Sequence, residues 1–338
     1  MHIENENQML NIVKIVNAQH LTVYRKEIMG LAILWVFMLH SGKIGNPVYD
    51  AVRSFGWVGV DVFFFLSAIG LCYSLKKNTC IIEFYKRRAS RILPTWWIIL
   101  LGVHLCGLIC NRFLSDLPFH APHTIPQILC WYTGLGFWIS DFVPNAECYY
   151  YEWYVPSLIV FYLFAPLLYK QRTKTLLIAL FFSIIISQIL SNTHTLYSLH
   201  FFYQRVPIFI SGFLCYRMIE SEWEKSSLVI LICALIGLIL YFCNSPFNLG
   251  IVSTHIYQLI MPLFCILIVW VIKGLKLNKF FAFYGGITLE LYLIHLYKRP
   301  LYVVGLVIHN QLFAILVTLI ICTCVAWLFQ KCIKKISI

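Results

Sequence analysis

A lone imidazole lies near the end of the first long apolar segment. In the stretch YRKEIMGLAILWVFMLHSG, from Tyr24 to Gly42, Arg25 comes near the beginning and His40 near the end. The ordinary pKa of histidine is about 6.5, so a neutral imidazole can take a proton from a hydroxyl group near neutral pH. His40 is therefore a candidate general base. The alternative is a polar cap at the end of an apolar span.

A carboxylate follows in the second apolar segment, FGWVGVDVFFFLSAIGL. Asp61 is expected in the first turn of a helix, where a negative charge complements the helix dipole. We expect it at a depth similar to that of His40, so it can alternatively orient the imidazole from a neighbouring helix. Small residues in this segment, among them Gly56, Gly59 and Gly70, permit close helix packing.

Three arginines lie close together in the stretch FYKRRASRILP. Arg91 follows Arg87 and Arg88 by four and three positions, so all three can share one side of a helix end. Guanidinium groups match the oxygens of phosphates, which makes a phosphate site at the cytoplasmic face one interpretation. The other is an ordinary basic anchor on the cytoplasmic side of a membrane.

Other polar groups stand at the ends of apolar segments or inside them, where an ionisable group is costly and so a functional candidate. Glu152 and Trp153 open one span in YYYEWYVPSLIVFY, and Arg205 lies at the end of another in FFYQRVPIFISGF. Glu290 and His295 occur in GGITLELYLIHL, and their spacing is roughly 140° around a helix, so we expect no contact between them. The alternatives are an aromatic belt for Trp153, a snorkelling side chain for Arg205 and a structural hydrogen bond for Glu290.

The composition indicates that these groups belong to a membrane protein. Of the 338 residues, 60% are hydrophobic and 12% charged, and a soluble domain of this size could not bury so much apolar surface. The net charge of +12 is typical of basic cytoplasmic loops, so we expect no nucleic acid as a partner. The thirteen cysteines lie mostly in apolar runs without Cys/His clusters, so no metal site is expected.

The pattern of apolar runs predicts an all-α polytopic membrane protein with about ten transmembrane helices. The expected spans are 24–42, 55–75, 93–111, 153–169, 175–193, 203–217, 227–243, 253–272, 281–297 and 304–330. With both termini in the cytoplasm, twenty of the 26 lysines and arginines fall on the cytoplasmic side, as the positive-inside rule requires. The chain then divides into a cytoplasmic segment 1–23, a membrane domain 24–330 and a basic cytoplasmic tail 331–338.

Six stretches, taken in this order, resemble the acyltransferase-3 family of membrane O-acyltransferases, of the glycan O-acetyltransferase type. The resemblance covers nearly the whole chain. The stretches are GLAILWVFMLH, GVDVFFFLSAIGL, FYKRRASRILP, EWYVPSLIVFY, RVPIFISGF and LELYLIH. Two positions depart from the family pattern. Met29 stands where the family commonly has Arg or Lys, and Arg25, one turn earlier, is the candidate to take its place; Ala68 replaces a glycine.

The resemblance implies a transferase that moves an acyl group, commonly acetyl, from acyl-CoA in the cytoplasm to a hydroxyl on the other side of the membrane. Acetyl-CoA would be a co-substrate, with no cofactor bound permanently. The acceptor would be a glycan or lipid-linked saccharide, and the location a bacterial plasma (inner) membrane crossed many times. His40 matches the family's base, and Arg87, Arg88 and Arg91 match the arginines expected to hold the CoA phosphates.

The mechanism that we expect begins when His40, the residue that matches the family's base, removes a proton from the acceptor hydroxyl while Asp61 orients its ring. The oxygen then attacks the thioester, and Arg205 or the hydroxyl of Ser67 stabilises the oxyanion. Direct transfer and an acyl-enzyme intermediate both remain open. The alternative function is a membrane transporter of a lipid-linked sugar or small solute, whose pathway the polar groups would line. The sequence shows no inverted repeat in support of it, and it predicts no oligomeric state.

Overall fold

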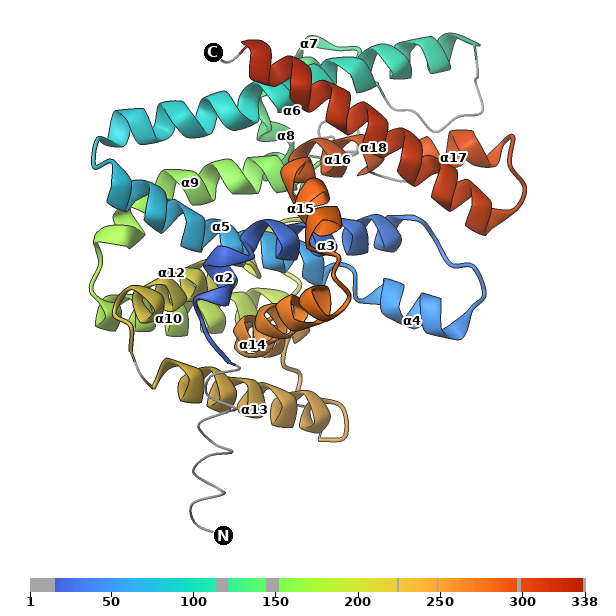
Figure 1. Ribbon diagram of the computed structural model, residues 1–338. Coiled ribbons are helices and arrows are strands. Elements are labelled where there is room, and N and C mark those ends of the chain that lie inside the picture. Colours follow the sequence, from blue (N-terminus) through green and yellow to red (C-terminus); the bar gives the residue numbers. More distant parts are fainter. Residues whose placement is uncertain are drawn as a thin grey trace.

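The computed structural model describes residues 16–113, 121–143, 152–223, 225–247, 249–296 and 299–336. Within these ranges every regular element is a helix. The long helices lie roughly side by side, with their axes running across the view of Figure 1. The predicted all-α class is therefore confirmed for the described residues.

The helices differ widely in length. They are α2 (His20–Val23), α3 (Arg25–His40), α4 (Pro47–Ser54), α5 (Val58–Lys77), α6 (Ile81–Phe113), α7 (Ile125–Thr133), α8 (Leu135–Ile139), α9 (Tyr154–Lys170), α10 (Thr173–Asn192), α11 (His200–Tyr203), α12 (Val206–Glu220), α13 (Ser226–Asn244), α14 (Ser253–Gly274), α15 (Asn278–Gly286), α16 (Thr288–His295), α17 (Arg299–Gly305) and α18 (Gln311–Ile336).

Six helical stretches in the described ranges are long and apolar enough to cross a membrane. They include α5, α6, α10, α13, α14 and α18, while α9 is a shorter apolar helix. The spans expected at 24–42 and 203–217 correspond to α3 and α12, with 16 and 15 residues, which is short for a perpendicular crossing. The count of ten crossings and the cytoplasmic placement of both termini stay predictions.

Three stretches differ from the predicted spans. The span expected at 281–297 is split into α15 and α16 at Ile287. Two glycines, Gly285 and Gly286, precede the break, and glycine is a poor helix former because it loses the most backbone entropy. The span expected at 304–330 begins only at Gln311, after α17. The span expected at 93–111 lies in a helix that begins already at Ile81, so α6 includes the arginine-rich stretch FYKRRASRILP.

The centre of the bundle is α5, which lies between α3 and α12 (Figure 1). Fifteen of its twenty residues are buried. Gly56 and Gly59 face backbone carbonyls of α3, at Trp35 and Ala32, so closely that a Cβ atom would clash there. The close packing expected from the glycines of this segment is thus found where α5 meets α3.

The closest helix crossing joins α3 to α15. A Cβ added at Gly30 would meet the carbonyl of Phe281, and one added at Gly285 would meet the carbonyl of Lys26. In Figure 1, α15 passes steeply across α3. Because both obstacles are backbone atoms, which cannot move aside as a side chain can, glycine is required on each side of the crossing.

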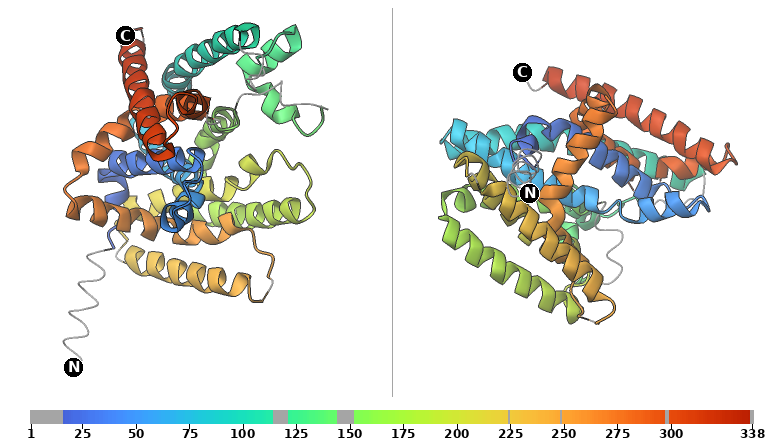
Figure 2. Two further views of the ribbon diagram at one scale, coloured as in Figure 1. Left: turned by 90° about the vertical axis from the view of Figure 1, so that its right-hand side faces the viewer. Right: turned by 60° about the horizontal axis from the view of Figure 1, so that its bottom comes forward.

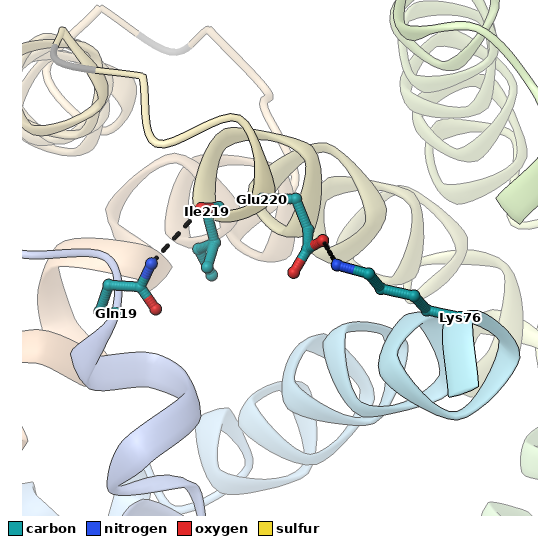
Figure 3. A network of polar contacts seen from close by, with 4 residues as sticks. All are labelled: Gln19, Lys76, Ile219 and Glu220. Carbon is teal, nitrogen blue, oxygen red and sulfur yellow. Dashed lines mark hydrogen bonds and ion pairs between the residues drawn. The ribbon is translucent and has the colours of Figure 1, made fainter.

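One end of the bundle is basic. The connections from α5 to α6 and from α9 to α10 lie on the left in Figure 1, and Lys76, Lys77 and Arg172 belong to these segments. We call this the basic end. There Lys76 of α5 pairs with Glu220 of α12, and the Nε2 of Gln19 donates to the carbonyl of Ile219 at 3.4 Å (Figure 3).

The pairing of Lys76 with Glu220 is a surface contact, since 57% and 25% of the two side chains are exposed, so it adds little to stability.

Helix α13 forms one edge of the bundle. Helix α13 lies along the outside of the molecule next to α14 in the views of Figure 2.

The glycine crossing leads to a stability prediction. We expect Gly285→Ala to lower the free energy of unfolding by about 1–3 kcal/mol, because the new methyl group overpacks against a backbone carbonyl. Thermal unfolding of the detergent-purified protein measures this. Gly286→Ala is the matched control, since nothing lies within 4 Å of a Cβ at that position. Equal melting temperatures for the two variants would contradict the proposed role of the crossing.

Candidate active site

His40 and His295 meet at the ends of their helices. The Nδ1 of His40 lies 2.9 Å from the Nε2 of His295, although 255 positions separate them in the chain. His40 ends α3 and is half-buried, whereas His295 ends α16 and is 2% exposed. Both residues were separate candidates from the sequence, and the structure joins them in one hydrogen bond.

The environment of His295 fixes its ring. Its Nδ1 lies 2.6 Å from the carbonyl oxygen of Leu291, one turn earlier in α16. The rings of Phe37 and Tyr292 lie 5.4 Å and 5.9 Å from it, centre to centre. His295 is thus held on one side by its own helix and packed between aromatic rings, which leaves Nε2 directed at His40.

Asp61 pairs with Arg205 of α12. The Oδ1 of Asp61 accepts from the Nε of Arg205 at 2.9 Å, and the two side chains are 0% and 6% exposed. The Oδ2 of Asp61 has no hydrogen-bond partner among the described residues. Among the described residues, the carboxylate of Asp61 therefore bonds to Arg205, and the expected pairing of Asp61 with His40 is not found. Asp61 faces α12, whereas α3 packs on the glycine side of α5.

Two further candidates, Trp153 and Ser67, differ in their position relative to this ion pair. The guanidinium of Arg205 lies over the ring of Trp153 at 5.2 Å, and Trp153 stacks on Phe201 at 5.1 Å. Ser67 is buried in α5, but it is six residues from Asp61 and so points about 120° away around the helix. Trp153 therefore supports Arg205, while Ser67 does not share the face that holds the pair.

Glu152 caps a helix. It lies in the connection before α9 and is 2% exposed. Its two carboxylate oxygens lie 3.1 Å and 2.9 Å from the backbone nitrogen of Val155, which donates to them. Burial raises the pKa of this carboxyl to about 8, against the opposing effect of the backbone donors. Glu152 thus has a structural role at the beginning of α9.

Glu290 lies in the first turn of α16 and is 2% exposed. A carboxylate in that turn complements the positive end of the helix dipole. Among the described residues, no three His, Cys, Asp or Glu side chains are grouped so that they could hold a metal ion.

A second cluster of cations gathers around Arg25, at the opposite end of α3 from His40. The Nε of Arg25 donates to the carbonyl of Leu66 at 3.1 Å, and its guanidinium lies against the bare backbone of Gly70. The charges of Arg88 and Arg91 lie near enough to act on Arg25. Arg25 thus lies near the arginines of α6, and its substitution for the residue at Met29 stays a prediction.

Arg88 occupies the best-defined position in this cluster. It lines a hollow of about 160 Å³ between α6 and α9, together with Tyr162. Its guanidinium lies 5.6 Å from the ring of Phe84 and 6.0 Å from that of Tyr162, and its Nε has no hydrogen-bond partner among the described residues. Arg87 is exposed and pairs with Glu83 at 3.5 Å, so it points away from this hollow.

Two supporting residues in this cluster were not recognised from the sequence. Tyr162 lies in an apolar span with several other aromatic residues, and no local pattern distinguishes it. The sequence predicts Gly70 only as a small residue for helix packing, whereas in the structure its missing side chain makes room for the guanidinium of Arg25. The sequence does contain a signal for this contact, since a glycine inside an apolar helix often indicates that another group packs closely against its backbone.

Helix α3 therefore carries one cluster at each end. It has 16 residues, which at 1.5 Å per residue separate Arg25 from His40 by about 22 Å. The first cluster can hold an anionic group such as a phosphate. The second can accept a proton from a hydroxyl group. The arrangement suits a reaction whose donor is anchored by its charge at one end and reacts at the other.

The buried pair of Asp61 and Arg205 leads to a second prediction. We expect Asp61→Leu and Arg205→Met each to lower the free energy of unfolding by about 3–5 kcal/mol, because each leaves one buried charge unpaired. The double variant should be more stable than either single one. Thermal unfolding of the four purified forms measures this, and losses that simply add would contradict a direct pairing.

Comparison with known proteins identifies the family of the chain. The model of a family described as an acyltransferase domain matches residues 29–331. The chain is 24% identical to ORF330 of Acidianus two-tailed virus, a candidate acetyltransferase by name, over 295 residues that cover 83% of this chain and 85% of the relative. No solved structure matches the chain. Since the family model spans most of the sequence, the chain belongs to the acyltransferase-3 family of membrane proteins.

Proposed function

We propose that this acyltransferase moves an acetyl group from acetyl-CoA, bound at the basic end of the bundle, to a hydroxyl of a glycan or lipid-linked saccharide at the opposite end. The observation that carries the proposal is the arrangement of α3, with Arg25 in a cluster of cations at one end and His40 at the other. The cations suit the phosphates of CoA, and the imidazole suits a base.

The donor would be held by three arginines and one aromatic ring. Arg25, Arg88 and Arg91 supply the positive charge that the phosphates would meet, and the ring of Tyr162 lies beside the guanidinium of Arg88. From there the flexible arm of the coenzyme would extend along α3. The thioester at its end would thus come near His40, on the side where the acceptor approaches.

The chemistry requires one proton acceptor and one donor to an oxyanion. His40 would take the proton of the acceptor hydroxyl while its oxygen attacks the thioester carbonyl. A carbon–oxygen bond forms, the carbon–sulfur bond breaks, and the proton passes from His40 to the thiolate of CoA. Arg205 would stabilise the oxyanion through the nitrogens that do not bind Asp61, with Ser67 as the alternative donor.

The acetyl group is the favoured acyl group because the viral relative is named for acetyl transfer. The basic residues at one end of the bundle support a cytoplasmic position for that end, where acetyl-CoA is available. The family implies a bacterial plasma membrane, and the acceptor would then be a glycan on its outer side. This orientation separates the donor and the acceptor, so the bundle itself must bring them together.

The first test of this function replaces the base. We expect cells that produce the protein to carry base-labile esters on their surface glycans, and we expect His40→Ala to remove these esters because no other group takes the proton. The ester content is measured at equal membrane levels of protein. His309→Ala, which changes an exposed histidine, is the matched control. Equal ester content in cells with the unmodified protein and with His40→Ala would remove His40 from the mechanism. If no cells carried the esters, the alternative function as a transporter would be favoured.

The second test concerns the donor site. We expect Gly70→Ala to raise the KM for acetyl-CoA about tenfold or more, with a smaller effect on kcat, because the methyl group displaces the Arg25 guanidinium and removes one charge-assisted contact to the coenzyme. Acetyl transfer in membrane vesicles at several acetyl-CoA concentrations measures this. Gly102→Ala is the control, since nothing lies within 4 Å of a Cβ there. An unchanged KM would place Arg25 outside the donor site.

A further inference from the structure

We propose that His295 is a positioning residue that holds His40 in the tautomer needed for catalysis, with the proton on Nδ1 and the lone pair on Nε2. The inference rests on the proposed function, in which His40 is the base. It follows from two hydrogen bonds, one from His295 to the backbone of its own helix and one between the two imidazoles.

The first hydrogen bond fixes the protonation of His295. Its Nδ1 lies 2.6 Å from the carbonyl oxygen of Leu291. A carbonyl oxygen accepts hydrogen bonds and never donates them, so the proton of this bond belongs to Nδ1. In a neutral imidazole one nitrogen donates and the other accepts. The Nε2 of a neutral His295 is therefore an acceptor.

Burial keeps His295 neutral. The residue is 2% exposed, and its hydrogen bonds and ring contacts within the described chain go to His40, the Leu291 carbonyl and the rings of Phe37 and Tyr292. None of these partners is a carboxylate that could pair with an imidazolium. A buried and unpaired positive charge is costly, so the neutral form of His295 is the one that these surroundings accommodate.

The second hydrogen bond then fixes the protonation of His40. Its Nδ1 lies 2.9 Å from the Nε2 of His295. Because that Nε2 is an acceptor, the Nδ1 of His40 must be the donor and must carry a proton. The lone pair of a neutral His40 is consequently on Nε2. This is the nitrogen that would take the proton of the acceptor hydroxyl.

The hydrogen bond between the two imidazoles would also persist when His40 is protonated during the reaction. When Nε2 takes a proton, His40 becomes an imidazolium, and its Nδ1 continues to donate to His295. The arrangement corresponds to that of a catalytic histidine whose second nitrogen is held by an acceptor that sets its tautomer and orientation. Here the acceptor is a neutral imidazole, which itself is oriented by the backbone of α16.

The test compares two substitutions of His295 that differ in one property. Gln offers an oxygen that can accept from the Nδ1 of His40, whereas Leu has a similar size and no acceptor. We expect His295→Leu to lower kcat about 10- to 100-fold with the KM for acetyl-CoA unchanged, a loss like that seen when a metal-bound histidine loses the partner that orients it. His295→Gln should recover at least several-fold of this loss.

The measurement uses inside-out membrane vesicles from cells that produce the full chain. Acetyl-CoA labelled in the acetyl group is added, and the base-labile label on endogenous glycans is followed over time, per amount of folded protein. His255→Leu is the matched control. It also replaces a buried histidine by leucine, but in α14, where neither ring nitrogen has a hydrogen-bond partner among the described residues. It should leave kcat unchanged.

The outcomes separate this inference from the proposed function. Equal activity of His295→Leu and the unmodified protein, with His40→Ala inactive, would overturn the inference and leave the function in place. Equally low activity of the Leu and Gln variants at normal melting temperatures would also overturn it, because acceptance of the hydrogen bond would then be irrelevant. Full activity of His40→Ala, or no labelled ester from the unmodified protein, would overturn the proposed function itself.

Discussion

The close contact between α3 and α15 is the constraint on which the rest of the site depends. Gly30 and Gly285 let the two backbones touch, and the chain then leaves α15 at Ile287 and begins α16. This change of direction brings the end of α16 to the end of α3, where His295 meets His40. A larger residue at the crossing would therefore act on the two histidines through the position of a whole helix.

The two groups of buried charges differ in their balance: Arg205 has a carboxylate partner, whereas Arg25 has other cations nearby. The positive charge of Arg205 is matched by Asp61 within the core, as in a structural ion pair. Arg25 has a carbonyl and the backbone of Gly70 as its neighbours, and further cations nearby. Like charges held close together repel unless an anion lies among them. The cluster around Arg25 thus favours a polyanionic ligand in a way that the Asp61 and Arg205 pair does not.

The sequence predicted the all-α fold and the residues of the candidate site better than it predicted their contacts. Hydrophobic segments of span length identify membrane helices because lipid requires them, and costly polar groups within them stand out, as His40 and Arg205 did. Partners are harder to predict, because a contact across 255 positions depends on helix crossings that no local pattern encodes. Asp61 shows this, since its depth is compatible with either neighbouring helix, and only the face on which it lies selects Arg205. The break at Ile287 escaped prediction because apolarity continues through it.

A rigid α3 would also fix the distance between the cations near Arg25 and the imidazole of His40. Its two ends are about 22 Å apart, and both would have to be engaged at once, the cations by an anionic group and the imidazole by the reacting centre. Acetyl phosphate carries its charge next to its acyl carbon and is too short to reach both. Acetyl-CoA holds its phosphates and its thioester far apart on one flexible chain. The length of a single helix would therefore select among donors that carry the same acetyl group, without any contact to that group itself.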